Sequence, residues 1–380
     1  FKDYLNSFDT HNLTLVQNGS DKIGGSTVNA TLSEEGIAVT LVFIDSTQGW
    51  LVTDSGLQDE APTAAYIAAT GGTVSTVCTN FKVHTFTGPG TFCVSSAGNA
   101  AGSNEVSYMV VAGGGGANQV YAAGGGAGGF REGKSPQDSY TSSPLACTSG
   151  SNNGLPVTAT GYPVTIGAGG GAQPTPSGRG ITGSNSVFAG TTTITSAGGG
   201  GGGSGGNPSP QTCAPGLPGG SGGGAGGFGP GTQTGGAGNT PPVSPPQGQP
   251  GGNATTPGQG YASSAGGGAT GAGTTFSGTT SPGSDTAVGG AGATTSINGT
   301  PTAFAGGGGG GVYGPGLPNT TTNAGGAGGG GQGTKNGPNP LPAASQNGTA
   351  NTGGGAGGGG NSAGGYGGGS GIVIIRYKFQ

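Results

Sequence analysis

The sequence predicts an all-β protein with almost no α-helix: one or two β modules at the amino terminus, followed by a glycine-rich sandwich of polyglycine-II helices. Glycine accounts for 100 of the 380 residues, against roughly 7% in an ordinary globular protein. The glycines are concentrated in residues 112–380, which hold 88 of them but only 9 of the 22 charged residues. Short β-rich segments lead into several glycine runs, and an apolar strand at 372–379 closes the chain.

Residues 1–53 are predicted to form a small β module. Residues 13–16 run into Asn18-Gly19, a dipeptide that favours tight hairpin turns. The run IAVTLVFI at 37–44 is rich in β-branched residues, and residues 50–52 can pair back onto it across a turn. This first module is therefore expected to consist of strands.

Residues 54–111 are predicted to contain a connector and a second β module. Residues 81–87 and 91–95 flank Gly88-Pro89-Gly90, which cannot continue a strand ladder and so marks a turn. We expect these two strands to form a hairpin. Glycine becomes abundant directly after this module, which places the glycine-rich domain at 112–380.

The glycine runs can build an ordered structure that other residues cannot. A polyproline-II helix has three residues per turn, a rise of ~3.1 Å and no internal hydrogen bonds, so its N–H and C=O groups point outward. Where every facing residue is glycine, neighbouring helices can approach closely and bond backbone to backbone in a hexagonal bundle. Backbone hydrogen bonds, each worth about 1 kcal/mol net, would then replace a hydrophobic core.

The purity of each run predicts its place in such a bundle. The uninterrupted runs 198–203 and 306–311, and the run 353–360, which is broken only by Ala356, suit surrounded positions. The runs 124–129 and 219–229 are interrupted by larger residues and suit an outer layer. The predicted glycine core therefore includes Gly200, Gly201, Gly308, Gly309 and Gly357.

A flexible linker is the main alternative to this ordered bundle, because glycine-rich chains are flexible in isolation. The runs recur about ten times at similar length, and β-rich segments lead into several of them. The apolar strand at the end of the chain also argues against a disordered tail, because a disordered tail would not be expected to end in an apolar strand. These features favour the ordered structure.

The composition argues against several classes of function. The formal net charge is −4 with no basic cluster, so no nucleic-acid partner is expected. No stretch approaches the ~20 apolar residues of a membrane-spanning helix. The sequence gives no sign of catalysis. It has only two histidines, and it lacks a nucleophile elbow in the right context and a phosphate-binding lysine motif, so we expect no enzyme activity and no cofactor.

The four cysteines do not suggest a metal site. None belongs to a CxxC pair, and neither histidine lies near a cysteine cluster, so no metal is expected. Cys78 and Cys93 flank the expected hairpin and could form a disulfide, or all four thiols could be idle.

Residues between the glycine runs are the candidates for contact with a binding partner. Charged side chains there could orient a sugar hydroxyl or keep a segment solvated, while tyrosine gives rigid contact area at small entropic cost. For the aromatic residues, packing against the glycine sandwich is the alternative role. The candidates are Asp138, Tyr140, Tyr261, Phe276, Tyr313 and Lys335.

The phrases VVAGGGG, GGGAGGFREG, GGGAGGFGPG and SGIVIIRYKF resemble the glycine-rich domains of bacteriophage tail-fibre and virion-surface proteins. The alternation of glycine runs with variable segments is similar to the distal tail-fibre adhesins of T-even-type phages. The resemblance, over about 106–380, implies a polyglycine-II sandwich whose tip contacts a host receptor. It also implies a homotrimer on the virion surface, held mainly through residues 1–111, which would also contact other virion or fibre proteins.

The resemblance therefore implies a structural and adhesive component of a phage fibre or virion surface that binds a host glycan or protein. A purely structural extracellular filament is the alternative, because the segments between runs are long and poor in aromatic residues. An ice-binding protein is the third class, although irregular proline-rich segments argue against its flat surface.

Overall fold

The computed structural model divides the chain into two compact units, residues 1–65 and 66–380. It describes residues 1–56, 64–119, 121–147, 154–173, 178–205, 214–227, 231–255, 262–277, 287–312, 323–334, 346–360 and 365–380. The eighteen named elements of these residues are all β-strands. The predicted fold class, all-β with almost no α-helix, is therefore confirmed.

The first unit contains two separate antiparallel pairs of strands. β1 (Leu13–Leu15) pairs with β2 (Ala30–Leu32), and β3 (Ala38–Asp45) pairs with β4 (Gly49–Gly56). The buried carboxylate of Asp3 accepts hydrogen bonds from the backbone N–H groups of Ser7, Phe8 and Gly36. Among the described residues of this unit, Val39 is the one buried apolar side chain.

The second unit begins with two β-sheets that face each other. The strand order of the first is β11-β10-β9-β18-β7-β6, with β12 paired to β9, and that of the second is β15-β14-β13-β8-β5. The first sheet contains β6 (Thr73–Val77), β7 (Phe81–Phe86), β9 (Glu105–Val111), β10 (Phe130–Gly133), β11 (Ala146–Cys147), β12 (Leu155–Pro156) and β18 (Ile372–Lys378). The second contains β5 (Ile67–Thr70), β8 (Gly90–Ala97), β13 (Gly161–Thr165), β14 (Ser186–Ala189) and β15 (Thr193–Ser196).

The predicted closing strand becomes the centre of the first sheet. β18 pairs antiparallel with both β9 and β7. Its alternate side chains, including Val373 and Ile375, join an apolar cluster with Phe92 and Phe188 of the second sheet. Ile372 and Ile374 face a second cluster under the short hairpin β16 (Ala293–Thr295) and β17 (Thr302–Phe304). Burial on both faces explains why the first four residues of this strand, 372–375, are all apolar.

The expected hairpin of residues 81–87 and 91–95 does not form. β7 bonds to β6 and β18 in the first sheet, whereas β8 bonds to β5 and β13 in the second. Gly88-Pro89 therefore carries the chain from one sheet to the other. The two strands do meet, but through their side chains, because Phe86 and Phe92 share the apolar cluster between the sheets.

The domain boundary also differs from the one placed after Val111. The strands of residues 67–111 belong to the same compact unit as the glycine runs, and the division between units lies after Ala65. The reason is that β18, at the far end of the sequence, inserts between β7 and β9. The second β module and the glycine-rich region are thus one folded unit.

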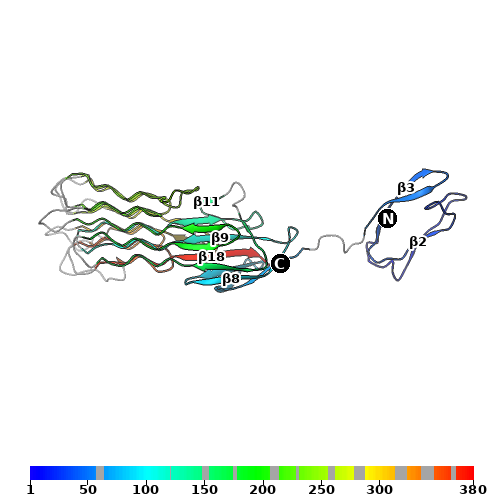
Figure 1. Ribbon diagram of the computed structural model, residues 1–380, viewed down its shortest axis with the longest axis horizontal. Helices are drawn as coiled ribbons and strands as arrows, with labels where there is room; N and C mark the ends of the chain where they lie inside the picture. Colours follow the sequence, from blue (N-terminus) through cyan, green and yellow to red (C-terminus); the bar gives the residue numbers. More distant parts are fainter. Residues whose placement is uncertain are drawn as a thin grey trace. The chain divides into compact units, whose positions relative to one another are not determined.

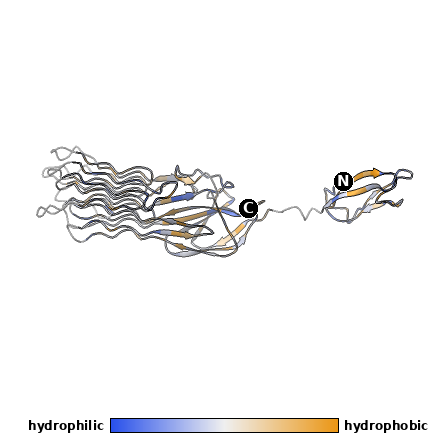
Figure 2. Cartoon of the chain, turned by 45° about the horizontal axis from the view of Figure 1, so that its top comes forward, coloured by the Kyte–Doolittle hydropathy of each residue, from blue (hydrophilic) through white to orange (hydrophobic). Residues whose placement is uncertain are grey.

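The glycine runs extend side by side from the sheets (Figure 1). Apolar residues are concentrated in the strands, while the runs are of intermediate hydropathy (Figure 2). In the run 112–117 the hydrogen-bond partner repeats every third residue: positions 112 and 115 donate to 126–129, positions 113 and 116 to 181–184, and positions 114 and 117 to 366–369. A period of three residues is that of a polyproline-II-type helix, as the sequence predicts.

The run 122–129 lies at the centre of this bundle. Its N–H groups donate to three neighbouring runs, and its C=O groups accept from three others. These six runs also bond to one another in a closed ring. They contain residues 112–115, 197–203, 221–224, 264–267, 308–311 and 353–359. The described glycine runs therefore pack in hexagonal shells around a single central helix.

The predicted order of layers is correct in part. The runs 306–311 and 353–360 are surrounded, as expected, but so are 122–129 and 221–225, which were expected on the outside. Ala127 is tolerated because it lies where the run meets the strands, in an apolar cluster with Phe130 and Phe304. A non-glycine residue within a glycine run therefore does not show that the run is on the outside of the bundle, because its side chain can pack at the end of the run beside the strands.

Candidate functional site

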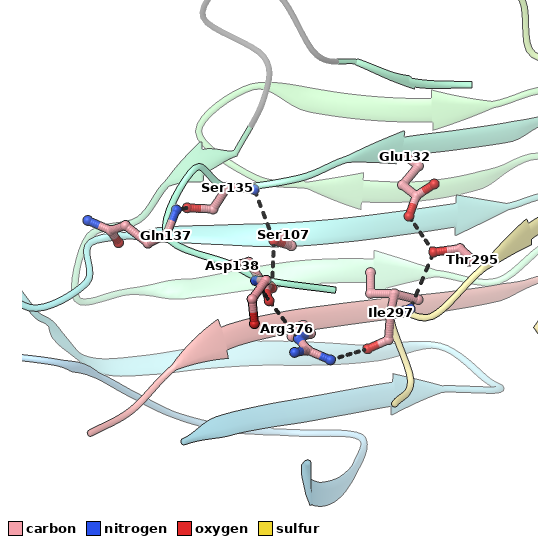
Figure 3. A network of polar contacts seen from close by, with 9 residues as sticks. Ser107, Glu132, Ser135, Gln137, Asp138, Thr295, Ile297 and Arg376 are labelled. Atoms are coloured by element: carbon pink, nitrogen blue, oxygen red, sulfur yellow. Dashed lines mark hydrogen bonds and ion pairs between the residues drawn. The ribbon is translucent and has the colours of Figure 1, made fainter. Parts of the chain in front are cut away.

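Two candidate residues, Asp138 and Tyr140, lie in the interior beside the sheets. The Asp138 carboxylate and the Arg376 guanidinium of β18 form a buried ion pair, with Nε and Oδ1 2.9 Å apart (Figure 3). Ser107 donates its hydroxyl to Oδ2 of Asp138 at 2.9 Å. The Tyr140 ring lies 5.1 Å from the Arg376 guanidinium. The expectation that these two side chains face a receptor is thus corrected, because both are buried against the chain's own strands.

A second buried carboxylate, Glu132, completes this polar network (Figure 3). It accepts hydrogen bonds from the Thr295 hydroxyl at 2.6 Å and from the Ser143 N–H at 2.9 Å. Burial raises the pKa of the Tyr140 phenol, and the negative charges of Glu132 and Asp138 raise it further. The network joins β18 to segments more than 70 residues away in sequence, so its role is to fix the sheet end of the bundle. Sequence reasoning missed Arg376 and Glu132 because their partners, Asp138 and Thr295, are far from them or carry no motif in the sequence, so no local pattern marks either charge as buried.

The third described candidate, Phe276, is buried at the other end of the glycine runs. It forms a small apolar cluster with Ala262 and Val312. Its expected exposure is thus corrected, and the alternative role, packing against the glycine sandwich, is the one the structure shows. Tyr261, Tyr313 and Lys335 lie outside the described residues.

The ends of the runs away from the sheets, which we call the far end, are held together by isolated bridges. Ala117 pairs with Tyr366, Ala122 with Ser204, Ala254 with Phe276 and Ala262 with Val312. Buried Tyr366 closes this end together with Ala117 and Ala356. The far end is therefore a packed surface rather than a set of frayed run ends.

The segments that leave the far end differ from the runs in composition. The segments 206–213, 256–261, 313–322 and 335–345 all combine proline with polar residues, and no two are alike in sequence. Each begins and ends at described residues of the far end, such as Thr255 and Ala262 around the second. The bundle thus brings the flanks of segments distant in sequence to one surface.

The predicted core glycines lie in contacts that leave no room for a side chain. A Cβ atom added to any of them would overlap a neighbouring backbone oxygen, at a distance of 2.3 Å or less. The five pairs are Gly200 with Leu217, Gly201 with Gly180, Gly308 with Ala356, Gly309 with Asn323, and Gly357 with Gln332.

The thiols of Cys78 and Cys93 are not joined, and both are exposed. Cys78 follows β6 of the first sheet and Cys93 lies in β8 of the second, so the absent hairpin also removes the reason for considering a disulfide between them. The described residues include no cluster of three or more His, Cys, Asp or Glu side chains that could hold a metal ion.

His84 is buried between the two sheets in a chain of hydrogen bonds. Its Nδ1 lies 2.7 Å from the Gly71 carbonyl, and its Nε2 lies 3.2 Å from the Tyr377 hydroxyl, which accepts from the Ala69 N–H. These partners suit a neutral imidazole that donates from Nδ1 and accepts at Nε2. Burial lowers the pKa of His84 below its usual value of 6.5, although the bond to Gly71 opposes this.

We expect His84 to make the second unit sensitive to acid. Because its pKa is lower in the folded chain, the unfolded chain binds more protons as the pH falls below about 6.5, and the free energy of unfolding decreases. Thermal melting at pH 7.5 and pH 5.0 should show a larger loss for wild type than for His84→Gln. Parallel losses in the two proteins would contradict this.

Residues 85–378 match the model of a protein family described as a glycine-rich domain. The chain belongs to this glycine-rich domain family. The match runs from the end of β7 to the end of β18, and so includes most of the two sheets as well as the glycine bundle. A search of curated proteins gives no significant match. In the part of the chain that the structure describes, no helix is long and apolar enough to cross a membrane.

Proposed function

We propose that this glycine-rich domain protein is a structural and adhesive component of a phage fibre or virion surface. In this proposal the bundle is a rigid scaffold, and the segments at its far end recognise a glycan or protein on the host cell. The chain acts outside the cell as a homotrimer, and its amino-terminal region joins it to other virion or fibre proteins. Recognition needs no enzyme activity and no cofactor.

The observation that supports the proposal is that the described flanks of the variable segments lie at one end of the bundle. Backbone hydrogen bonds between the described runs hold the runs in place, and the segments between them differ in sequence. Loops that vary on a rigid scaffold are the usual place for binding residues. Tyr261, Tyr313 and Lys335 belong to these segments and remain the proposed contacts.

Binding of the labelled full-length chain to a panel of bacterial strains tests this function. We expect saturable binding to some strains, and a loss of affinity of tenfold or more when Tyr261, Tyr313 and Lys335 are all replaced with alanine, which corresponds to about 1.4 kcal/mol. Thr193→Ala, an exposed change on β15, is the matched control and should bind like wild type.

Two results would contradict the proposal. Unchanged binding by the triple variant would show that recognition lies elsewhere. No binding of the wild-type chain to any strain would favour a purely structural role. Immunogold labelling of phage particles tests the proposed location independently of any receptor.

A further inference from the structure

Tyr121 lies at the centre of the far end, directly before the central run 122–129. Its backbone φ is +43°, a conformation that glycine adopts freely and that is strained for a large side chain. The chain has 100 glycines, yet this position, which glycine would fit best, is a tyrosine. Strained residues of this kind cluster at binding and catalytic sites, so the tyrosine ring is the feature that needs a reason.

The backbone of Tyr121 is held by residues that adjoin three of the variable segments. Its carbonyl accepts hydrogen bonds from the Gly205 N–H at 2.9 Å and from the Ser263 hydroxyl at 2.6 Å. Its own N–H donates to the Gly360 carbonyl at 2.7 Å. In sequence, these three partners lie within two residues of the segments 206–213, 256–261 and 361–364, respectively. Tyr121 is therefore the point at which the flanks of three variable segments meet.

The side chains at this point combine an aromatic ring with an amide. Tyr121 is partly exposed, and so is Gln119, whose backbone borders Gly359 of the neighbouring run. A tyrosine ring gives rigid contact area at small entropic cost, and it can cover the apolar C–H face of a sugar ring. A glutamine amide both donates and accepts hydrogen bonds, as sugar hydroxyls do.

The composition of the three adjoining segments favours a sugar over a protein surface. The cores of protein interfaces are enriched in Tyr, Trp, Phe, Met and Arg. Of these residue types, the segments contain a single tyrosine, Tyr261, and they contain no charged residue. Their polar side chains are Ser, Thr, Asn and Gln, which hydrogen-bond to hydroxyl groups without an ion pair.

We propose that Tyr121 is a receptor contact at the centre of the far end, where its ring stacks on a sugar of a host surface glycan. This contact belongs to the proposed function, on which the inference rests, and it narrows the receptor to a glycan. The three hydrogen bonds fix the backbone beneath the ring before the sugar arrives, which lowers the ordering cost of binding.

Binding of the labelled full-length chain to a strain that the wild type recognises tests the role of the ring. We expect Tyr121→Gly to bind about tenfold more weakly or worse, because the ring is lost. Its melting temperature should not change, because relief of the strain offsets the greater freedom of glycine in the unfolded chain. Tyr121→Phe keeps the ring and should bind within about threefold of wild type.

Cys78→Gly is the matched control. Cys78 is exposed, lies between β6 and β7, and has a φ of +48°, so this change relieves a similar strain away from the far end. It should bind like wild type. Full binding by Tyr121→Gly would overturn the proposed contact. Weaker binding together with a lower melting temperature would also overturn it, because the ring would then be part of the packing.

Treatment of the cells separates a glycan from a protein receptor. Periodate, which cleaves the vicinal diols of sugars, should abolish binding, whereas digestion of surface proteins with a protease should leave it unchanged. Binding that resists periodate and is lost after the protease would overturn the glycan and leave the proposed function standing. Failure of the wild-type chain to bind any strain would instead overturn the proposed function itself.

Discussion

Replacing Gly308 with alanine is expected to lower the free energy of unfolding of the second unit by about 3 kcal/mol, within the range of severe overpacking. Gly308 donates to the Gly125 carbonyl and accepts from the Gly266 N–H, both at 2.9 Å. A Cβ at this position would overlap the Ala356 carbonyl oxygen. Because that oxygen is held in the lattice, the new methyl group would separate two runs and break several hydrogen bonds together. Thermal melting and protease resistance measure the loss.

Gly171 provides a matched control in an outer run. A Cβ there would meet the Ile181 side chain at 3.6 Å, an ordinary contact distance. Gly171→Ala should therefore be neutral or slightly stabilising, because alanine restricts the unfolded chain. If Gly308→Ala and Gly171→Ala both melt like wild type, the surrounded packing of the glycine runs is wrong.

Replacing Arg376 with methionine is expected to cost about 3–5 kcal/mol of unfolding free energy, as when one partner of a buried ion pair is removed. Methionine keeps much of the apolar stem beside Phe81, over which the guanidinium lies at 4.5 Å. The loss would therefore come mainly from the Asp138 carboxylate, which stays buried without its cation. Denaturant unfolding measures this difference.

The double variant Arg376→Met with Asp138→Asn separates charge from packing. A neutral amide at position 138 removes the unpaired charge and can still accept from Ser107. We expect the double variant to be more stable than Arg376→Met alone. Equal stability of the two would show that the ion pair is not the source of the loss.

The glycine bundle could be predicted because its requirement is local: only runs without side chains can bond backbone to backbone on three faces. The closing strand at 372–379 could also be predicted from its apolar run, whereas its burial on both faces is seen only in the structure. The place of each run in the shells could not be predicted. It depends on which runs meet across the bundle, and Ala127 shows that one methyl group can be accommodated at the end of a central run.

The candidate site was harder to predict for the same reason. Asp138 and Tyr140 are in a long polar segment, which from the sequence is expected at the surface. In the structure they are buried beside β18, where Asp138 pairs with Arg376, 238 residues away in sequence. The contact of β7 with β18, rather than with β8, is also non-local. Both errors arise because the end of the chain returns to the middle of a sheet, which no local pattern reveals.

The three-residue repeat of the hydrogen bonds sets a rule for how this scaffold can change in length. Each run presents the same face to the same neighbour every third residue, so a run can gain or lose residues in threes and keep all of its partners. Each such step adds about 9 Å. An insertion of one or two residues would rotate the rest of the run toward other neighbours. The bundle can therefore evolve in length only in whole turns made in many runs together.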